Sequence, residues 1–263
     1  MAPAGYFTDA SMLRRVQREH VVALAGPRAL LMQATHPVIW NGFFASTDSW
    51  KDPYPRLERT AMVLNAIGFG TREAADRATA PVRAVHSRVR GVLPDAAGRF
   101  PAGTPWAADD PALLLWILAT LVDSNLLVYQ RYVRRLDRDE QEAYWQDFRT
   151  VGELFGLPRS ETPETIGAFE AYVREMLGSG DLFVSPRTRE LAVDIVMRPP
   201  LPAWAFPLRE LVNQITVGLL PDEIRRLYGF PWDPLRRAAV RGGAEYLRRV
   251  VVPLLPERVR YAA

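Results

Sequence analysis

Apolar positions recur along most of the chain with the spacing of amphipathic helices, and prolines, glycines and capping residues separate these segments. Asp110 followed by Pro111 is typical of an N-cap with proline at the first helical position. Thr71 is predicted to cap a long helix that Pro81 interrupts. The expected helices cover residues 28–36, 56–67, 72–90, 111–136, 137–155, 162–177, 186–197, 205–217, 221–228 and 234–251.

Alternating strand patterns are almost absent, and Phe183–Val184 is the only short candidate. The pattern therefore predicts an all-α fold, a single domain of roughly ten helices spanning residues 1–263. Residues 198–207 are rich in proline and form the clearest linker. Residues 205–263 are a candidate C-terminal helical cap.

The amino-acid composition limits the kinds of cofactor and catalytic site that the chain can form. Hydrophobic residues make up 48% of the 263 positions, enough for a core that encloses a cofactor. The absence of cysteine excludes disulfides, thiolate nucleophiles, zinc–thiolate sites, iron–sulfur clusters and thiolate-ligated haem. A redox metal would have to be held by histidine, carboxylate, tyrosine or methionine.

The net charge and the hydropathy pattern indicate which partners and which cellular location to expect. The net charge is +3, almost all positive charge is arginine, and no basic stripe interleaved with aromatics occurs, so we do not expect nucleic-acid binding. The longest apolar run, residues 112–122, is shorter than the roughly 20 residues that span a bilayer. The first residues lack a signal-peptide layout. We therefore expect no membrane span and a cytoplasmic location.

The most informative stretch is residues 35–91. Arg83 lies one turn before His86, and Arg56 and Thr60 share another helix face. Cations and a potential metal ligand turned toward a core suggest an anionic guest that contains a metal. Haem fits, because its iron needs an imidazole and its two carboxylates need arginines.

Each of these residues also has an ordinary structural interpretation. His86 is flanked by valines and can be a core histidine, and an ordinary salt bridge can explain Arg83. Arg56 or Arg59 can pair with Glu58 or Asp52.

Three further polar residues leave alternatives open. His36 precedes Pro37 and is predicted to be structural, capping a helix end, while His20 resembles a solvated position. Asp123 lies in an apolar segment and needs a partner, such as Arg83 or a histidine N–H, unless it faces outward.

Glycine-rich phosphate loops, Gly-x-Ser-x-Gly elbows and Glu-x-x-His pairs do not occur.

The chain resembles the DUF2236 family, the catalytic domain of latex-clearing rubber oxygenases and MpaB-type oxygenases. The resemblance covers nearly the whole chain and rests on several short motifs in order. They are GPRALLMQ from Gly26, THP from Thr35, DPYPRLERT from Asp52, VRAVHSRVRG from Val82, DDPALLLW from Asp109, ATLVDS from Ala119 and LYGFPW from Leu227.

The resemblance implies an all-helical domain that binds haem b through one histidine, which by motif position is His86. It assigns functional roles to Arg56 and Thr60 and a cofactor-binding role to Arg83 and Arg56. The function expected from it is that of an oxygenase or oxidase acting with dioxygen on an apolar small molecule, with an open sixth site on the iron. Arg59 cannot be a sixth ligand because it stays protonated.

Two alternatives to this function remain. One is a haem-binding or apolar-ligand-binding protein without turnover, and the other is a helical interaction protein without cofactor. The chain also departs from its relatives, which often have histidine at the position of Leu118 and smaller residues after Pro37. No clear carboxylate there can act as the base of rubber cleavage, so we do not expect rubber to be the substrate.

Overall fold

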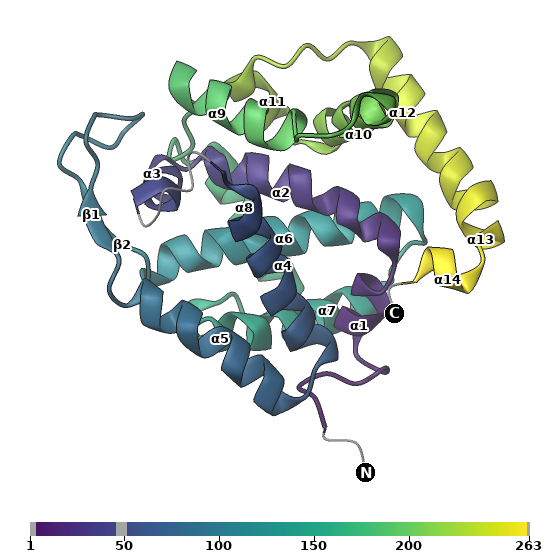
Figure 1. Cartoon of the computed structure of the whole chain (residues 1–263), viewed down its shortest axis with the longest axis horizontal. Helices are drawn as coiled ribbons and strands as arrows, with labels where there is room; N and C mark the ends of the chain where they lie inside the picture. Colours follow the sequence, from purple (N-terminus) through teal and green to yellow (C-terminus); the bar gives the residue numbers. More distant parts are fainter. Residues whose placement is uncertain (1–3, 46–51, 262–263) are drawn as a thin grey trace.

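Helices form nearly all of the regular structure in the computed structural model, which describes residues 4–45 and 52–261 (Figure 1). This confirms the all-α prediction. The helices are α1 (Met12–Gln17), α2 (Ala25–Ala34), α3 (Pro37–Ala45), α4 (Tyr54–Phe69), α5 (Arg72–His86), α6 (Pro111–Tyr132), α7 (Arg138–Leu154), α8 (Ile166–Gly178), α9 (Pro186–Met197), α10 (Phe206–Leu219), α11 (Asp222–Tyr228), α12 (Pro234–Tyr246), α13 (Val252–Leu254) and α14 (Glu257–Arg260). A 3-10 turn, η1 (His20–Leu24), precedes α2, and a π-helical segment, η4 (Leu247–Val251), follows α12.

Several helix ends follow the predicted capping chemistry. The Asp110 side chain accepts a hydrogen bond from Ala112 N at 2.8 Å, and Thr71 caps α5 in the same way. Asp137 and Glu140 form a reciprocal capping box at the start of α7. These bonds satisfy backbone N–H groups that have no partner within the helix.

The structure corrects three predicted boundaries. Helix α5 continues through Pro81, which is exposed, instead of being interrupted there. Pro37 opens α3 instead of only ending the preceding helix, because proline is tolerated in a first turn. Helix α8 is capped by Thr165, not Thr162.

The strand prediction was wrong in position. Phe183 and Val184 lie in an irregular segment, where Phe183 N donates to the Thr35 carbonyl at 2.7 Å. The described residues instead contain a two-stranded antiparallel sheet, β1 (Arg90–Val92) and β2 (Pro105–Ala107), which pairs Gly91 with Trp106. A side chain on Gly91 would collide with the Trp106 ring, so glycine permits this close approach.

Helix α6 is the centre of the core. Trp116 and Val122 on α6 and Trp145 on α7 are fully buried. Within the described part of the chain, α6 alone is long and apolar enough to cross a bilayer, with a mean hydropathy of 1.8, but 67% of that window is buried inside the fold. This burial is what the central helix of a helical domain requires.

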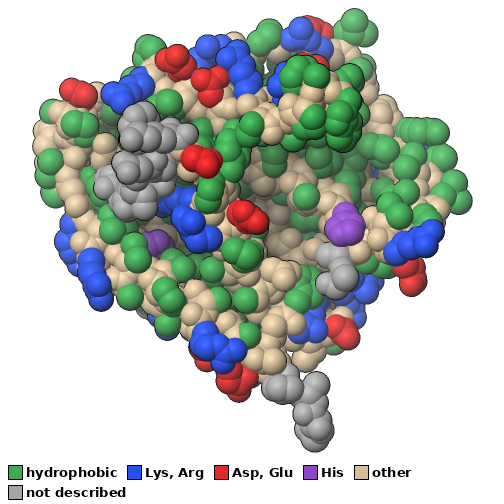
Figure 2. All heavy atoms as spheres, viewed as in Figure 1, with side chains coloured by type: hydrophobic (Ala, Val, Ile, Leu, Met, Phe, Trp, Pro, Cys, Tyr) green, Lys and Arg blue, Asp and Glu red, His purple; other side chains and the backbone are tan. Residues whose placement is uncertain are grey.

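The C-terminal segment returns to the N-terminal helices (Figure 1). Arg260 donates three hydrogen bonds of 2.7 to 3.1 Å to Glu19, whose side chain is buried. His20 is exposed, as expected, and its Nδ1 lies 2.9 Å from the Val259 carbonyl oxygen. Figure 2 shows hydrophobic side chains gathered over α12 and α13, where Leu235 and Leu254 are largely exposed.

Candidate functional site

Helices α3, α4 and α5 bring Arg56 close to His86. Arg56 is half-buried, its Nη1 donates to the Phe43 carbonyl, and its guanidinium carbon lies 4.2 Å from the centre of the Phe43 ring. Burial, with a smaller contribution from Arg59, lowers the pKa of Arg56. An arginine remains a cation under these conditions, so the site holds a partly desolvated positive charge.

His86 is the last residue of α5 and is half-buried. Its Nδ1 is buried and has no hydrogen-bond partner among the residues that the structure describes. Burial and then the charge of Arg56 lower the pKa of His86, while Asp109 opposes them. The imidazole is therefore neutral at neutral pH, the form in which histidine binds metals.

Arg83 lies one turn before His86, but its guanidinium group reaches α7. Its Nη1 donates to the Leu154 carbonyl at 2.6 Å and to Thr79 Oγ1 at 3.0 Å. The last carbonyls of a helix lack partners within the helix, so Arg83 caps α7. The ordinary salt-bridge interpretation fails for the described residues, because no carboxylate lies within ion-pair distance of Arg83.

Thr60 lies one turn after Arg56 on the same helix. It is exposed, and its hydroxyl donates to the Arg56 carbonyl at 3.0 Å. Neither Glu58 nor Asp52 forms an ion pair with Arg56 or Arg59 within residues 4–45 and 52–261. The partner of Arg56 is thus the backbone and ring of Phe43.

Apolar side chains near these residues face outward. Val85 precedes His86 and is 52% exposed, and Met62, two residues after Thr60, is 57% exposed. Single exposed apolar side chains are common on protein surfaces, so these two residues do not by themselves define a binding surface.

His36 is buried between α2 and α3, and its ring centre lies 5.4 Å from that of Phe100. Burial lowers the pKa of His36 to about 4, with Asp181 opposing and Arg99 reinforcing the shift. The C-cap of α2 is Thr35, and His36 Nδ1 makes no hydrogen bond to any described residue. His36 Nδ1 therefore does not cap the end of α2.

Asp123 pairs with an arginine that sequence reasoning did not select. Arg28 Nη2 lies 2.7 Å from Asp123 Oδ2, and the same guanidinium bonds Ser124 and the Leu219 carbonyl. Asp123 is therefore partnered, but not by Arg83 or a histidine.

Sequence reasoning also missed two contributors to the site. Phe43 positions Arg56, and its only sequence signal is the aromatic run after Pro37. Asp109, which also binds Arg90 at 3.4 Å, acts on the pKa of His86 from a distant segment. No group of three or more histidine, aspartate and glutamate side chains within the described ranges could hold a bare metal ion.

Comparison with known proteins gives one match. The family model described as ER-bound oxygenase mpaB/B'/Rubber oxygenase, catalytic domain, matches residues 13–260. No curated protein and no solved structure matches the chain.

Proposed function

The chain belongs to the family of mpaB and rubber oxygenase catalytic domains, and from this premise we propose that it is a haem b-dependent oxygenase. In this proposal, His86 would hold the iron, and dioxygen would bind without a second protein ligand. The substrates are dioxygen and an apolar small molecule.

The environment of His86 carries the proposal. A buried polar atom without a partner is uncommon in native proteins, and a bound group is one explanation of such an atom. His86 has this feature together with a lowered pKa, so it offers a neutral imidazole at pH 7. His36 shares both properties, and we favour His86 because the charge of Arg56 acts on it and not on His36. Haem needs only one such protein ligand, because the porphyrin supplies the other nitrogens.

Arg56 fits the acidic edge of haem. Its half-buried guanidinium contacts only the Phe43 carbonyl and ring among the described residues. A propionate would give this cation a charged partner, which no residue in the described part of the chain provides. Arg83 is the second proposed propionate partner, through Nε and Nη2, which make no hydrogen bond to any described residue.

Apolar residues and Thr60 would provide the contacts for a molecule bound beside the cofactor. When bound, haem supplies the chemistry of dioxygen activation. Val85 and Met62 are more than half exposed, so they offer a bound molecule apolar contacts only at the helix surface. The Thr60 hydroxyl can exchange its bond to the Arg56 carbonyl for a polar group of a bound molecule, because the side chain is exposed.

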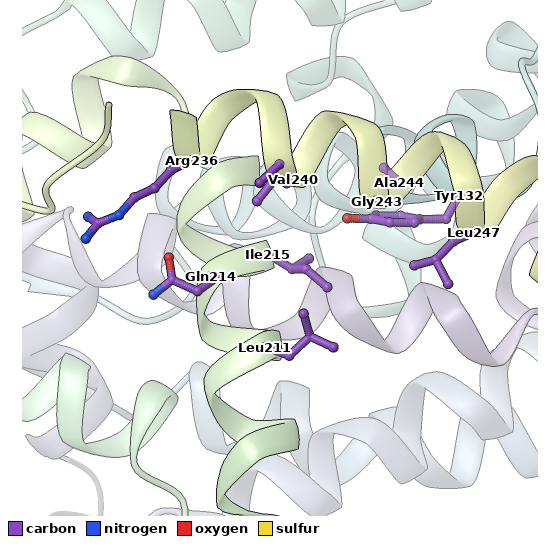
Figure 3. Close-up of a pocket in the computed structure, with 10 residues that line it drawn as sticks. Tyr132, Leu211, Gln214, Ile215, Arg236, Val240, Gly243, Ala244 and Leu247 are labelled. Carbon is purple, nitrogen blue, oxygen red and sulfur yellow. The ribbon is translucent and has the colours of Figure 1, made fainter. Parts of the chain in front are cut away.

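A second candidate function is the binding of an apolar ligand without turnover. An apolar pocket of about 240 Å³ lies between α10 and α12 and is lined by Leu211, Ile215 and Tyr132 (Figure 3). The Tyr132 hydroxyl is buried and lacks a partner among the described residues, so a small ligand with one polar group would suit it.

One experiment separates these functions. The full chain is purified with added haemin, and its visible spectrum is recorded with and without His86→Ala. The proposal expects a strong Soret band that this substitution removes, together with oxygen-dependent loss of an apolar test substrate. Stoichiometric haem without substrate loss supports a haem-binding protein without turnover, and no Soret band at all rejects haem binding and leaves the binding of an apolar ligand.

A further inference from the structure

A second cavity, of about 640 Å³, lies between α6, α12 and the turn from α10 to α11. None of its lining residues belongs to the site around Arg56 and His86. Seven arginines and only three carboxylates line it, so its walls carry a marked excess of positive charge.

The carboxylates of this cavity are already paired. The ion pairs are Arg28 with Asp123, Arg225 with Asp222, and Arg248 with Glu245. The other four arginines make no side-chain hydrogen bond or ion pair with any residue that the structure describes. They are Arg131, Arg135, Arg237 and Arg241.

These four cations come from the end of α6, the segment that follows it, and α12. Arg131 lies in the last turn of α6 and Arg135 follows four residues later. Arg237 and Arg241 are four residues apart and share one face of α12. Val240 and Ala244 line this cavity and also the apolar pocket of Figure 3, so α12 separates a basic cavity from an apolar one.

A fifth cation lies deeper in the same cavity. Arg225 is buried, donates to the Val217 carbonyl at 3.1 Å and lies 5.2 Å from the Trp232 ring centre. Burial and the nearby charge of Arg237 lower the pKa of Arg225. Arg135, Arg237 and Arg241 are exposed, so solvent screens part of the repulsion between these cations, and an anion bound among them would relieve the rest.

We propose that this arginine-lined cavity binds a phosphate-bearing anion with at least two negative charges, taken either from a soluble phosphate compound or from a lipid headgroup. Guanidinium groups bind phosphate oxygens in pairs and remain charged at any relevant pH. The volume suits a small ligand. The inference does not depend on haem, since the cavity and the Arg56–His86 site share no residue.

The test compares two double variants of the full chain that lose the same charge. Arg237→Gln/Arg241→Gln removes two cavity cations, and Arg187→Gln/Arg258→Gln removes two exposed arginines elsewhere. Binding of inorganic pyrophosphate is measured by titration calorimetry, and binding to vesicles of phosphatidylcholine with and without phosphatidic acid by co-sedimentation. Circular dichroism checks that both variants are folded.

We expect saturable pyrophosphate binding that the cavity variant weakens at least about tenfold, or about 1.4 kcal/mol, while the control variant changes it less than about twofold. The same pattern with phosphatidic acid vesicles alone identifies a lipid headgroup as the phosphate source. The proposal is wrong if neither probe binds the unmodified chain, or if both double variants weaken binding equally, since the arginines would then be ordinary solvated charges.

Discussion

Arg28 and Asp123 join α2 to α6 through an ion pair of 2.7 Å between Nη2 and Oδ2. The Arg28 side chain is only 3% exposed, whereas that of Asp123 is 31% exposed. The same guanidinium binds Ser124 Oγ, also on α6, at 2.6 Å and the Leu219 carbonyl on α10 at 2.7 Å, so one cation links α2 to both helices.

Replacing Arg28 should therefore cost more stability than neutralising Asp123. Arg28→Met leaves three acceptors without their donor and should lower the free energy of unfolding by about 3 kcal/mol. Asp123→Asn keeps an acceptor beside Arg28, and its site is partly solvated, so it should cost about 1 kcal/mol. Urea unfolding followed by circular dichroism measures both. Equal losses in the free energy of unfolding of the two variants would contradict the expectation that Arg28 contributes more stability than the charge of Asp123.

The half-buried His86 and the buried His36 should differ in their effect on the cofactor. We expect His86→Ala to abolish stoichiometric haem binding, because His86 supplies the proposed iron ligand, and to leave a folded helical protein. His36→Ala should retain haem and its axial imidazole signature in the visible spectrum. If only His36→Ala removes that signature, the wrong histidine has been assigned.

His36 should also make the fold sensitive to acid. Its pKa is lowered to about 4 from the usual 6.5, so below pH 6.5 the unfolded chain binds a proton that the folded chain rejects. The stability associated with neutral His36 is complete above pH 6.5 and is lost as the pH falls to about 4, a loss of about 3 kcal/mol. Below pH 4 this dependence should stop.

The measurement compares urea unfolding of the unmodified chain and His36→Phe at pH 7, 5.5 and 4. Phenylalanine fills a similar volume beside Phe100 and has no proton to bind. The difference between the two proteins should shift in favour of the variant as the pH falls. A constant difference over this range would show that His36 does not titrate in this way.

Local rules predicted most of the helices because their evidence lies within a few residues. Asp110 and Asp137 cap the helices that follow them, and each needs only neighbouring N–H groups. The β1–β2 pairing was missed because three-residue strands carry no recognisable period, and Pro81 was misjudged because the packing of α5 overrides a local preference.

The sequence predicted which residue types form the candidate site, but not the directions in which their side chains point. The spacing of Arg83 and His86 placed both on one helix face, yet the carbonyl that holds Arg83 belongs to Leu154, 71 residues away. Likewise, Arg28 and Asp123 are separated by 95 residues. Such pairings depend on how helices pack, and a single sequence contains no local signal for them.

Arg56 and Thr60 should have separable roles although they share one helix face. Arg56→Ala removes the bond to the Phe43 carbonyl and the contact with its ring, and it also removes the proposed propionate partner. We expect at least a tenfold loss of haem affinity and a loss of about 1 to 2 kcal/mol in the free energy of unfolding, because α4 loses its link to α3.

Thr60→Val should behave differently, because the Thr60 hydroxyl bonds only the carbonyl of its own helix and the side chain is exposed. Stability should change by less than about 1 kcal/mol and haem should be retained, while the rate of substrate loss should fall if the hydroxyl acts on a bound molecule. Haem titration, thermal melting and oxygen-dependent turnover test both variants together. If Thr60→Val loses haem and Arg56→Ala retains it, the arginine does not anchor the cofactor, since a half-buried cation facing a propionate cannot be the less important of the two contacts.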